Sequence, residues 1–74
     1  MLKAEEYRER RESVLGWPVR IVSYRLGDHW RCEIDNVDPG AQIARAEGPS
    51  REEAEQHALS KASERLGRTR LRQP

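Results

Sequence analysis

A stripe of small and apolar residues in the last third of the chain restricts the fold more than any other feature. Ala54, Ala58, Ala62 and Leu66 recur at four-residue spacing, as residues on one face of a helix do. Because alanine side chains are short, such a helix can lie close to a sheet whose larger side chains fill the space between them. The stripe therefore predicts a helix packed on a β-sheet.

The sequence also marks where this helix begins and ends. Ser50 and Glu53 form a capping box, in which the serine hydroxyl accepts from the Glu53 amide and the carboxylate accepts from the Ser50 amide. Gly67 follows the last residue of the stripe, where glycine commonly ends a helix. We therefore expect a helix over residues 50–66 with Ser50 and Glu53 as its cap, followed by a basic, flexible tail over 67–74.

The middle of the chain has the patterns of β-strands. Residues 19–26 (VRIVSYRL) are rich in β-branched side chains, and residues 29–35 (HWRCEID) alternate apolar and charged ones. The Gly-Asp dipeptide between them predicts a tight hairpin. Residues 41–46 (AQIARA) predict a shorter third strand at the sheet edge. The expected sheet is antiparallel and three-stranded, spans residues 18–46, and needs a helix on its apolar face.

The first segment, residues 1–16, predicts an N-terminal helix. It is rich in Leu, Lys, Ala, Glu and Arg, and its first glycine, Gly16, can end the helix. Its apolar stripe is weak, so such a helix needs neighbours to be stable, and the sequence leaves open whether it docks on the sheet. The expected order of elements is αβββα, in one α+β domain over residues 1–66.

Composition argues against several classes of function. The chain has 74 residues and one cysteine, so its core is thin and no disulfide can form within it. The charged start is neither a signal peptide nor a membrane span, which favours a cytoplasmic location without membrane contact. Cys32 alternates with Trp30 and Ile34 and is expected to be a buried thiol.

Chemistry-bearing side chains form no recognisable catalytic or metal-binding pattern. His29, His57 and Cys32 lack the number and spacing of zinc ligands. No pairing of a nucleophile with a base stands out, and a thin core has little room for a substrate. We therefore expect no enzymatic activity, no catalytic residue, no metal or other cofactor and no small-molecule substrate.

The run GAQIARAEGPSREEAEQHALSKASERL, residues 40–66, resembles the C-terminal half of a double-stranded RNA-binding domain. In that family a third strand ends in a glycine-bearing loop, and a serine-capped helix with alanines on its packing face follows. The resemblance is loose over residues 17–39 and topological over residues 1–16. It implies the αβββα fold and suggests RNA as a ligand.

The residues that contact RNA in that family are largely replaced. Its second helix opens with a lysine pair directed at phosphates, where this chain has Arg51, Glu52 and Glu53. A glutamate about 6 Å from a phosphate repels it by roughly 3 kcal/mol at an effective dielectric constant near 20, less where water screens the charges. The loop that enters the minor groove in the family is short here, although His29 remains, and glutamates balance the arginines of the first segment.

A second resemblance is to antitoxins of the HicB type. The runs HWRCEIDNVDPGAQ and GPSREEAEQHA are similar to the strand, Pro-Gly turn and helix start of that family, although residues 40–50 form a longer connection than is usual there. This resemblance implies a regulator that binds a co-encoded toxin.

The favoured hypothesis is a small interaction module that binds a protein partner or forms a homodimer. Its candidate partner surface contains an aromatic residue before the first predicted strand and two residues on one face of that strand, because apolar side chains occur on both faces of the strand. The alternative is weak nucleic-acid binding, since the basic tail could contact phosphates without reading sequence. The candidate partner residues are Trp17, Val22 and Tyr24, and the candidate nucleic-acid contacts are His29, Arg51, Arg68, Arg70 and Arg72.

Overall fold

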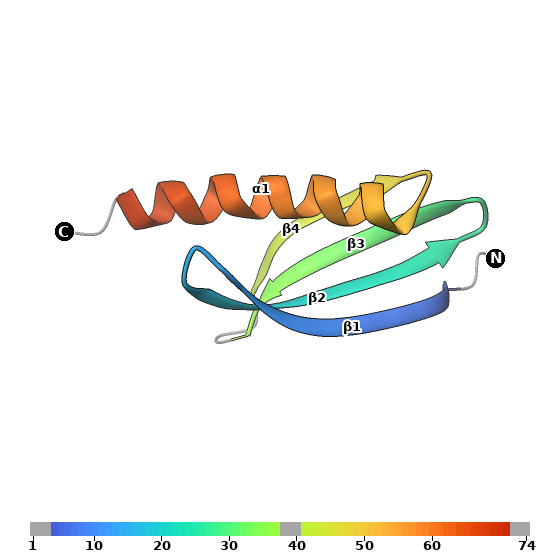
Figure 1. Ribbon diagram of the computed structural model, residues 1–74, viewed down its shortest axis with the longest axis horizontal. Helices are drawn as coiled ribbons and strands as arrows, with labels where there is room; N and C mark the ends of the chain where they lie inside the picture. Colours follow the sequence, from blue (N-terminus) through green and yellow to red (C-terminus); the bar gives the residue numbers. More distant parts are fainter. Residues whose placement is uncertain (1–3, 38–40, 72–74) are drawn as a thin grey trace.

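The computed structural model describes residues 4–37 and 41–71, and the side chains within them as far as residue 68. Four strands form one antiparallel sheet in the order β1-β2-β3-β4, and one helix lies across a face of it, so the predicted α+β class is confirmed (Figure 1). The molecule is elongated, with extents of 46 × 19 × 19 Å. Its elements are β1 (Ala4–Val14), β2 (Trp17–Leu26), β3 (His29–Asn36), β4 (Gln42–Gly48) and α1 (Arg51–Leu71).

The first segment is a strand, so the prediction of an N-terminal helix was wrong and the sheet has four strands instead of three. β1 pairs with β2 along its length, with Arg10 opposite Ile21 and Val14 opposite Trp17. Within β1, Val14 alone is buried. Backbone pairing with β2 outweighs the helix propensity of this charged segment, which has no apolar stripe that would hold it as a helix on the sheet.

Two-residue turns join the first three strands. Leu15 and Gly16 both have positive φ, 51° and 83°, which matches the twist that a tight hairpin needs. Gly16 therefore lies in a hairpin turn and does not end a helix. Gly27, with a φ of 63°, opens the second turn, and Leu26 pairs with His29 across it. This confirms the hairpin predicted between the two central strands.

An irregularity near the start of β1 interrupts the free edge of the sheet. The register shifts between Glu5 and Arg8, and Glu6 between them has a positive φ of 55°. Bulges and charged side chains are common on edge strands because they hinder pairing with another chain.

The core lies between α1 and the sheet. The three alanines of the predicted stripe are fully buried in α1, and Leu66 is 5% exposed, which confirms the packing face of the helix. Facing them, Ile21, Cys32 and Ile34 are at most 1% exposed. Trp30 of β3 is half-buried at the margin of this cluster. Short helix side chains against large strand side chains give the close layer packing that the sequence indicates.

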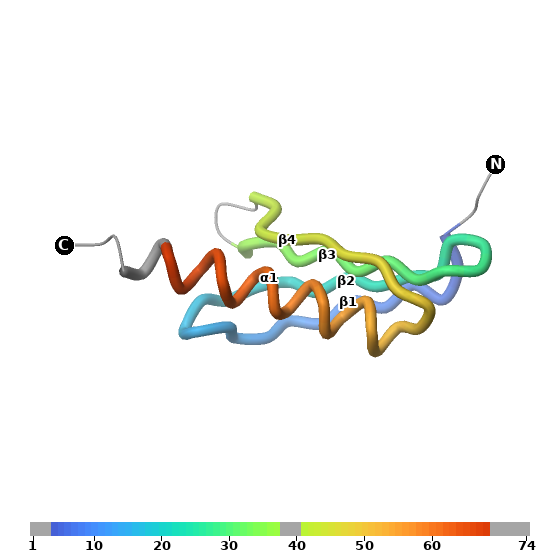
Figure 2. Tube along the Cα trace, turned by 90° about the horizontal axis from the view of Figure 1, so that it is seen from above, coloured from blue at the N-terminus to red at the C-terminus, as the bar shows by residue number. Residues whose placement is uncertain are grey.

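The helix extends past the end predicted at residue 66. It runs through Gly67 to Leu71, where a flexible tail was expected, and residues 72–74 lie outside the described part of the chain. The β1–β2 hairpin lies beside the C-terminal half of α1 (Figure 2). A Cβ atom at Gly67 would stand 3.7 Å from Leu15 Cδ1, an ordinary contact. Among the described residues, no helix combines the length and apolar character needed to cross a bilayer.

Candidate functional site

The sheet face turned away from α1 is the candidate functional site, and we call it the open face. In β2, Ile21 belongs to the core and Ser23 Oγ donates to Glu55 Oε2 of α1 at 3.2 Å, so both point toward the helix. The alternating residues Val22 and Tyr24 therefore point the other way. Strand pairing and ring stacking assign further side chains to this face. The open face comprises Tyr7, Glu9, Arg11, Arg20, Val22, Tyr24, Arg31, Glu33, Asp35, Arg45 and Glu47.

Two tyrosines stack on the open face. The rings of Tyr7 and Tyr24 have centroids 6.3 Å apart and an interplanar angle of 13°. The Tyr24 hydroxyl donates to Glu33 Oε2 at 2.7 Å. Burial, and then this bond to a carboxylate, raise the pKa of Tyr24. Tyr7 is 61% exposed, so the pair presents a rigid aromatic surface to solvent.

The open face carries charges of both signs in balance. Arg20 Nη2 lies 2.9 Å from Asp35 Oδ2, and Arg31 Nε lies 3.4 Å from Glu33 Oε2. The hydrogen bond to Asp35 raises the pKa of Arg20. As many carboxylates as arginines occupy this face, so its formal charge is neutral. Such a face has little long-range attraction for a polyanion.

The three candidate partner residues do not form one patch. Tyr24 belongs to the open face, but Val22 at its centre is only 8% exposed beneath its neighbours. Trp17 is half-buried and packs against the core on the α1 side. Of the three, Tyr24 alone belongs to an accessible aromatic surface, which it forms with Tyr7.

The start of α1 has the cap that the sequence predicts. The Glu53 amide donates to Ser50 Oγ at 3.2 Å, which is the serine half of the capping box, and Ala54 N–H donates to the Ser50 carbonyl at 3.0 Å. Glu52 and Glu53 lie exposed in the first helical turn. Their charges oppose the attraction that a helix N-terminus has for anions.

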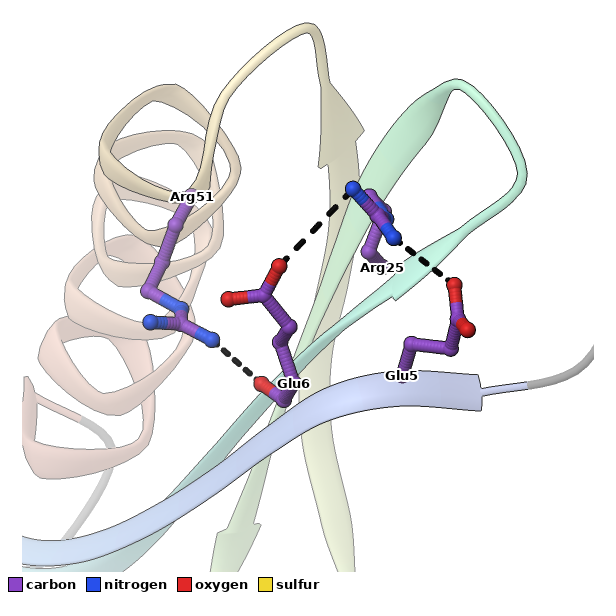
Figure 3. Close-up of polar contacts among 4 residues, drawn as sticks. All are labelled: Glu5, Glu6, Arg25 and Arg51. Carbon is purple, nitrogen blue, oxygen red and sulfur yellow. Dashed lines mark hydrogen bonds and ion pairs between the residues drawn. The ribbon is translucent and has the colours of Figure 1, made fainter.

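Arg51 is engaged within the fold. Its guanidinium donates to the Glu6 carbonyl (Figure 3). It also lies over the Trp30 ring, 4.6 Å from the ring centroid. In the same region Arg25 Nη2 is 2.7 Å from Glu5 Oε1, and Arg25 Nη1 is 3.7 Å from Glu6 Oε2. These contacts fasten the bulge of β1 to β2 and to the helix start. Arg51 thus links the helix start to β1 and β3, and its predicted role as a phosphate contact stays a prediction.

The other candidate nucleic-acid contacts are spread along the molecule. His29 is half-buried at the β2–β3 hairpin, its two ring nitrogens each 3.6 Å from a carboxylate oxygen, of Asp28 and of Glu47. Arg68 Nη2 lies 3.3 Å from Glu64 Oε1, and Arg68 follows Arg51 by seventeen positions, about 25 Å along the helix. These residues do not form a single basic patch. Arg70 lies in the last turn of α1, and Arg72 lies outside the described residues.

A polar cluster lies beneath the flank of α1 that faces β1 and β2. Glu55 accepts from the buried Ser23 and forms an ion pair with Arg10, whose Nη1 is 2.9 Å from Glu55 Oε1. Cys32 is fully buried nearby, which confirms the predicted buried thiol, and burial raises its pKa to about 12. A thiol with this pKa is a poor nucleophile at neutral pH. Within the described residues, no three acidic, histidine or cysteine side chains are grouped as metal ligands.

Sequence reasoning missed a groove between β4 and the second half of α1. Its volume is about 510 Å³. Lys61 Nζ donates to the Arg45 carbonyl at 3.3 Å, and Arg65 Nη1 donates to the Ile43 carbonyl at 2.9 Å. The sequence indicates part of this arrangement, because Lys61 and Arg65 each directly precede a residue of the buried stripe. Both cations therefore lie on a flank of the stripe. The sequence does not show that this flank faces β4.

In comparisons with known proteins, no family model, no curated protein and no solved structure matches the chain. The observed order of strands and helix, ββββα, also differs from the αβββα order of the double-stranded RNA-binding domain. That family's contact region on a first helix has no counterpart here, because residues 4–14 form β1.

Proposed function

We propose that the chain is a non-catalytic interaction module that binds a protein partner through its open face. The observation that carries the proposal is the stacked, accessible Tyr7–Tyr24 pair surrounded by arginines and carboxylates in equal number. Tyrosine and arginine are enriched among the residues that dominate protein interfaces, and stacked rings lose little conformational entropy on binding. A face of mixed charge complements a protein surface of mixed charge.

Nucleic-acid binding through His29, Arg51 and the C-terminal arginines is the alternative. Against it stand the contacts of Arg51 with Glu6 and Trp30, and the carboxylates beside Arg20 and Arg31. Phosphate binding would require Arg51 to give up its contacts with Glu6 and Trp30, and Arg20 and Arg31 to exchange carboxylates for phosphates. A HicB-type antitoxin is a special form of the favoured proposal, in which the protein partner is a toxin.

Partner binding can be tested with matched variants of the open face. Tyr7→Ala and Arg31→Glu change accessible side chains of the open face, whereas Glu52→Gln changes an exposed side chain at the start of α1 and serves as the control. A protein captured in stoichiometric amount by the immobilised chain is purified and titrated calorimetrically against all forms. We expect both open-face variants to weaken binding and the control to retain it. Unchanged affinity in both would contradict this site.

Self-association and RNA binding are measured in parallel. Sedimentation equilibrium tests for a homodimer, and a dimer weakened by Tyr7→Ala would identify a second copy as the partner. A filter titration with a short RNA duplex at low salt tests the alternative. Saturable duplex binding with no protein partner and no dimer would replace the proposal by nucleic-acid binding.

A further inference from the structure

The free edge of β4 is occupied by side chains of the chain's own helix. β4 pairs with β3 on one side and lies at the end of the described sheet. The carbonyls of Ile43 and Arg45, two residues apart, accept from Arg65 and Lys61 of α1. The pairing with β3 passes from Ala44 to Gln42, so Ile43 lies at an irregularity of β4, and the carbonyls of Ile43 and Arg45 are both within reach of α1 side chains.

The spacing of Lys61 and Arg65 along α1 is similar to the spacing of the two carbonyls along β4. Lys61 and Arg65 are four residues apart, a rise of about 6 Å along a helix. Two residues of a regular strand span about 6.8 Å, a similar distance. Lys61 reaches the Arg45 carbonyl and Arg65 reaches the Ile43 carbonyl. Both bonds are made by long side chains of exposed residues of α1.

The groove beside this edge is strongly basic. Three side chains of α1 that line it carry a positive charge, and Glu64 is the acidic residue among those that line it. Glu64 is itself 3.3 Å from Arg68 and so neutralises one of the three. The groove has both the volume and the charge to receive an extended segment with carboxylate side chains. These cations are Lys61, Arg65 and Arg68, whereas Arg45 contributes its backbone carbonyl and directs its side chain to the open face.

We propose that this groove binds an acidic, extended peptide segment of a partner protein, which adds to β4 as a fifth strand. Peptide amides replace Lys61 and Arg65 as donors to the Arg45 and Ile43 carbonyls, and the released cations pair with carboxylates of the peptide. Strand addition supplies main-chain hydrogen bonds, and the cations select for acidic side chains. A phosphate backbone fits less well, because it has no donors for the edge carbonyls.

This edge site is separate from the open face, and its test does not depend on that proposal. The probe is a blocked synthetic peptide of alternating threonine and glutamate, titrated into the isotope-labelled full chain and followed by NMR. We expect saturable shifts at residues 42–47 and 61–68, with slower hydrogen exchange of the Ile43 and Arg45 amides as they gain acceptors. A peptide of alternating threonine and lysine should give none of these changes.

Variants that remove positive charge show whether the groove is responsible. Lys61→Gln combined with Arg65→Gln should weaken peptide binding roughly tenfold. The control, Arg8→Gln, removes a positive charge from an exposed position of β1 that belongs neither to the groove nor to the open face, and it should bind as the unmodified chain does. If the double groove variant loses its dispersed NMR spectrum, single Lys61→Gln replaces it, with a smaller expected loss.

Several outcomes would overturn the proposal. One is the lack of shifts at β4 with the acidic peptide, and another is equal loss of binding in the groove and control variants. Tighter binding of a single-stranded oligonucleotide at the same residues would assign the groove to nucleic acid. Concentration-dependent NMR shifts of β4 residues without added peptide would show that a second copy of the chain binds in the groove.

Discussion

Arg51, the first residue of α1, lies over the ring of Trp30 from β3 and donates to the Glu6 carbonyl of β1. One side chain thus joins the helix start to two strands. Glu6 has a φ of 55°, in the left-handed region that costs a non-glycine residue about 1–2 kcal/mol. The bond to its carbonyl helps to hold the backbone there, so the contact stabilises the bulge as well as the helix.

Arg51→Ala should lower the free energy of unfolding by about 1–3 kcal/mol, because it removes both the cation–π contact and the hydrogen bond to Glu6. Arg51→Lys should recover part of the loss, since it keeps the charge but not the planar group. Urea unfolding measures both, with the exposed Arg8→Ala as control. Equal effects at Arg51 and Arg8 would contradict a structural role for Arg51.

Removal of the cap should destabilise α1. Ser50→Ala eliminates the acceptor for the Glu53 amide and should cost about 1 kcal/mol. Ser60→Ala, at an exposed position within the helix, should leave stability unchanged or raise it by a few tenths of a kcal/mol. Thermal unfolding of the pair compares them directly, and similar melting temperatures would show that Ser50 does not cap the helix.

Two glycine-to-alanine changes should have opposite signs. A Cβ at Gly48 would lie 3.0 Å from Ala54 N and 3.2 Å from Glu53 Cβ, so Gly48→Ala should destabilise the fold by about 1–3 kcal/mol. At Gly67 the added Cβ would meet Leu15 Cδ1 at 3.7 Å inside a helix, so Gly67→Ala should stabilise by about 0.5–1 kcal/mol. Urea unfolding decides both. A destabilising Gly67→Ala would indicate that the helix ends before Leu71.

Stability should fall at alkaline pH because of Cys32. Its pKa is about 12 in the folded protein and about 9 when unfolded, so above pH 9 the folded state binds more protons than the unfolded state. The free energy of unfolding therefore declines as pH rises from 9 toward 12. Tyr24, whose pKa is also raised, adds to the decline. The free energy of unfolding, measured across this pH range, should decline less steeply for Cys32→Ala than for the unmodified chain. Parallel declines in the two proteins would contradict the assignment to Cys32.

The elements that the sequence predicts correctly have local signals. The capping serine, the alanine stripe and the alternation around Cys32 each arise from neighbours in the chain, and each appears in the structure as a cap, a buried helix face and a core strand. The hairpin at Gly27 has the same origin. Such features follow from backbone periodicity and turn chemistry, which depend on a few adjacent residues.

The elements that the sequence did not reveal depend on contacts between distant segments. Residues 4–14 are charged, favour a helix locally and bury little, so β1 forms because β2 offers a ladder of backbone partners. Arg51 is a structural link because Glu6 and Trp30 come to it from other strands, and Lys61 and Arg65 reach β4 because α1 runs beside that edge. Local residue types determined the helix and the central hairpin, whereas tertiary structure decided the fourth strand and the use of the cations, because hydrogen bonding and ion pairing between segments depend on chain geometry that no local pattern contains.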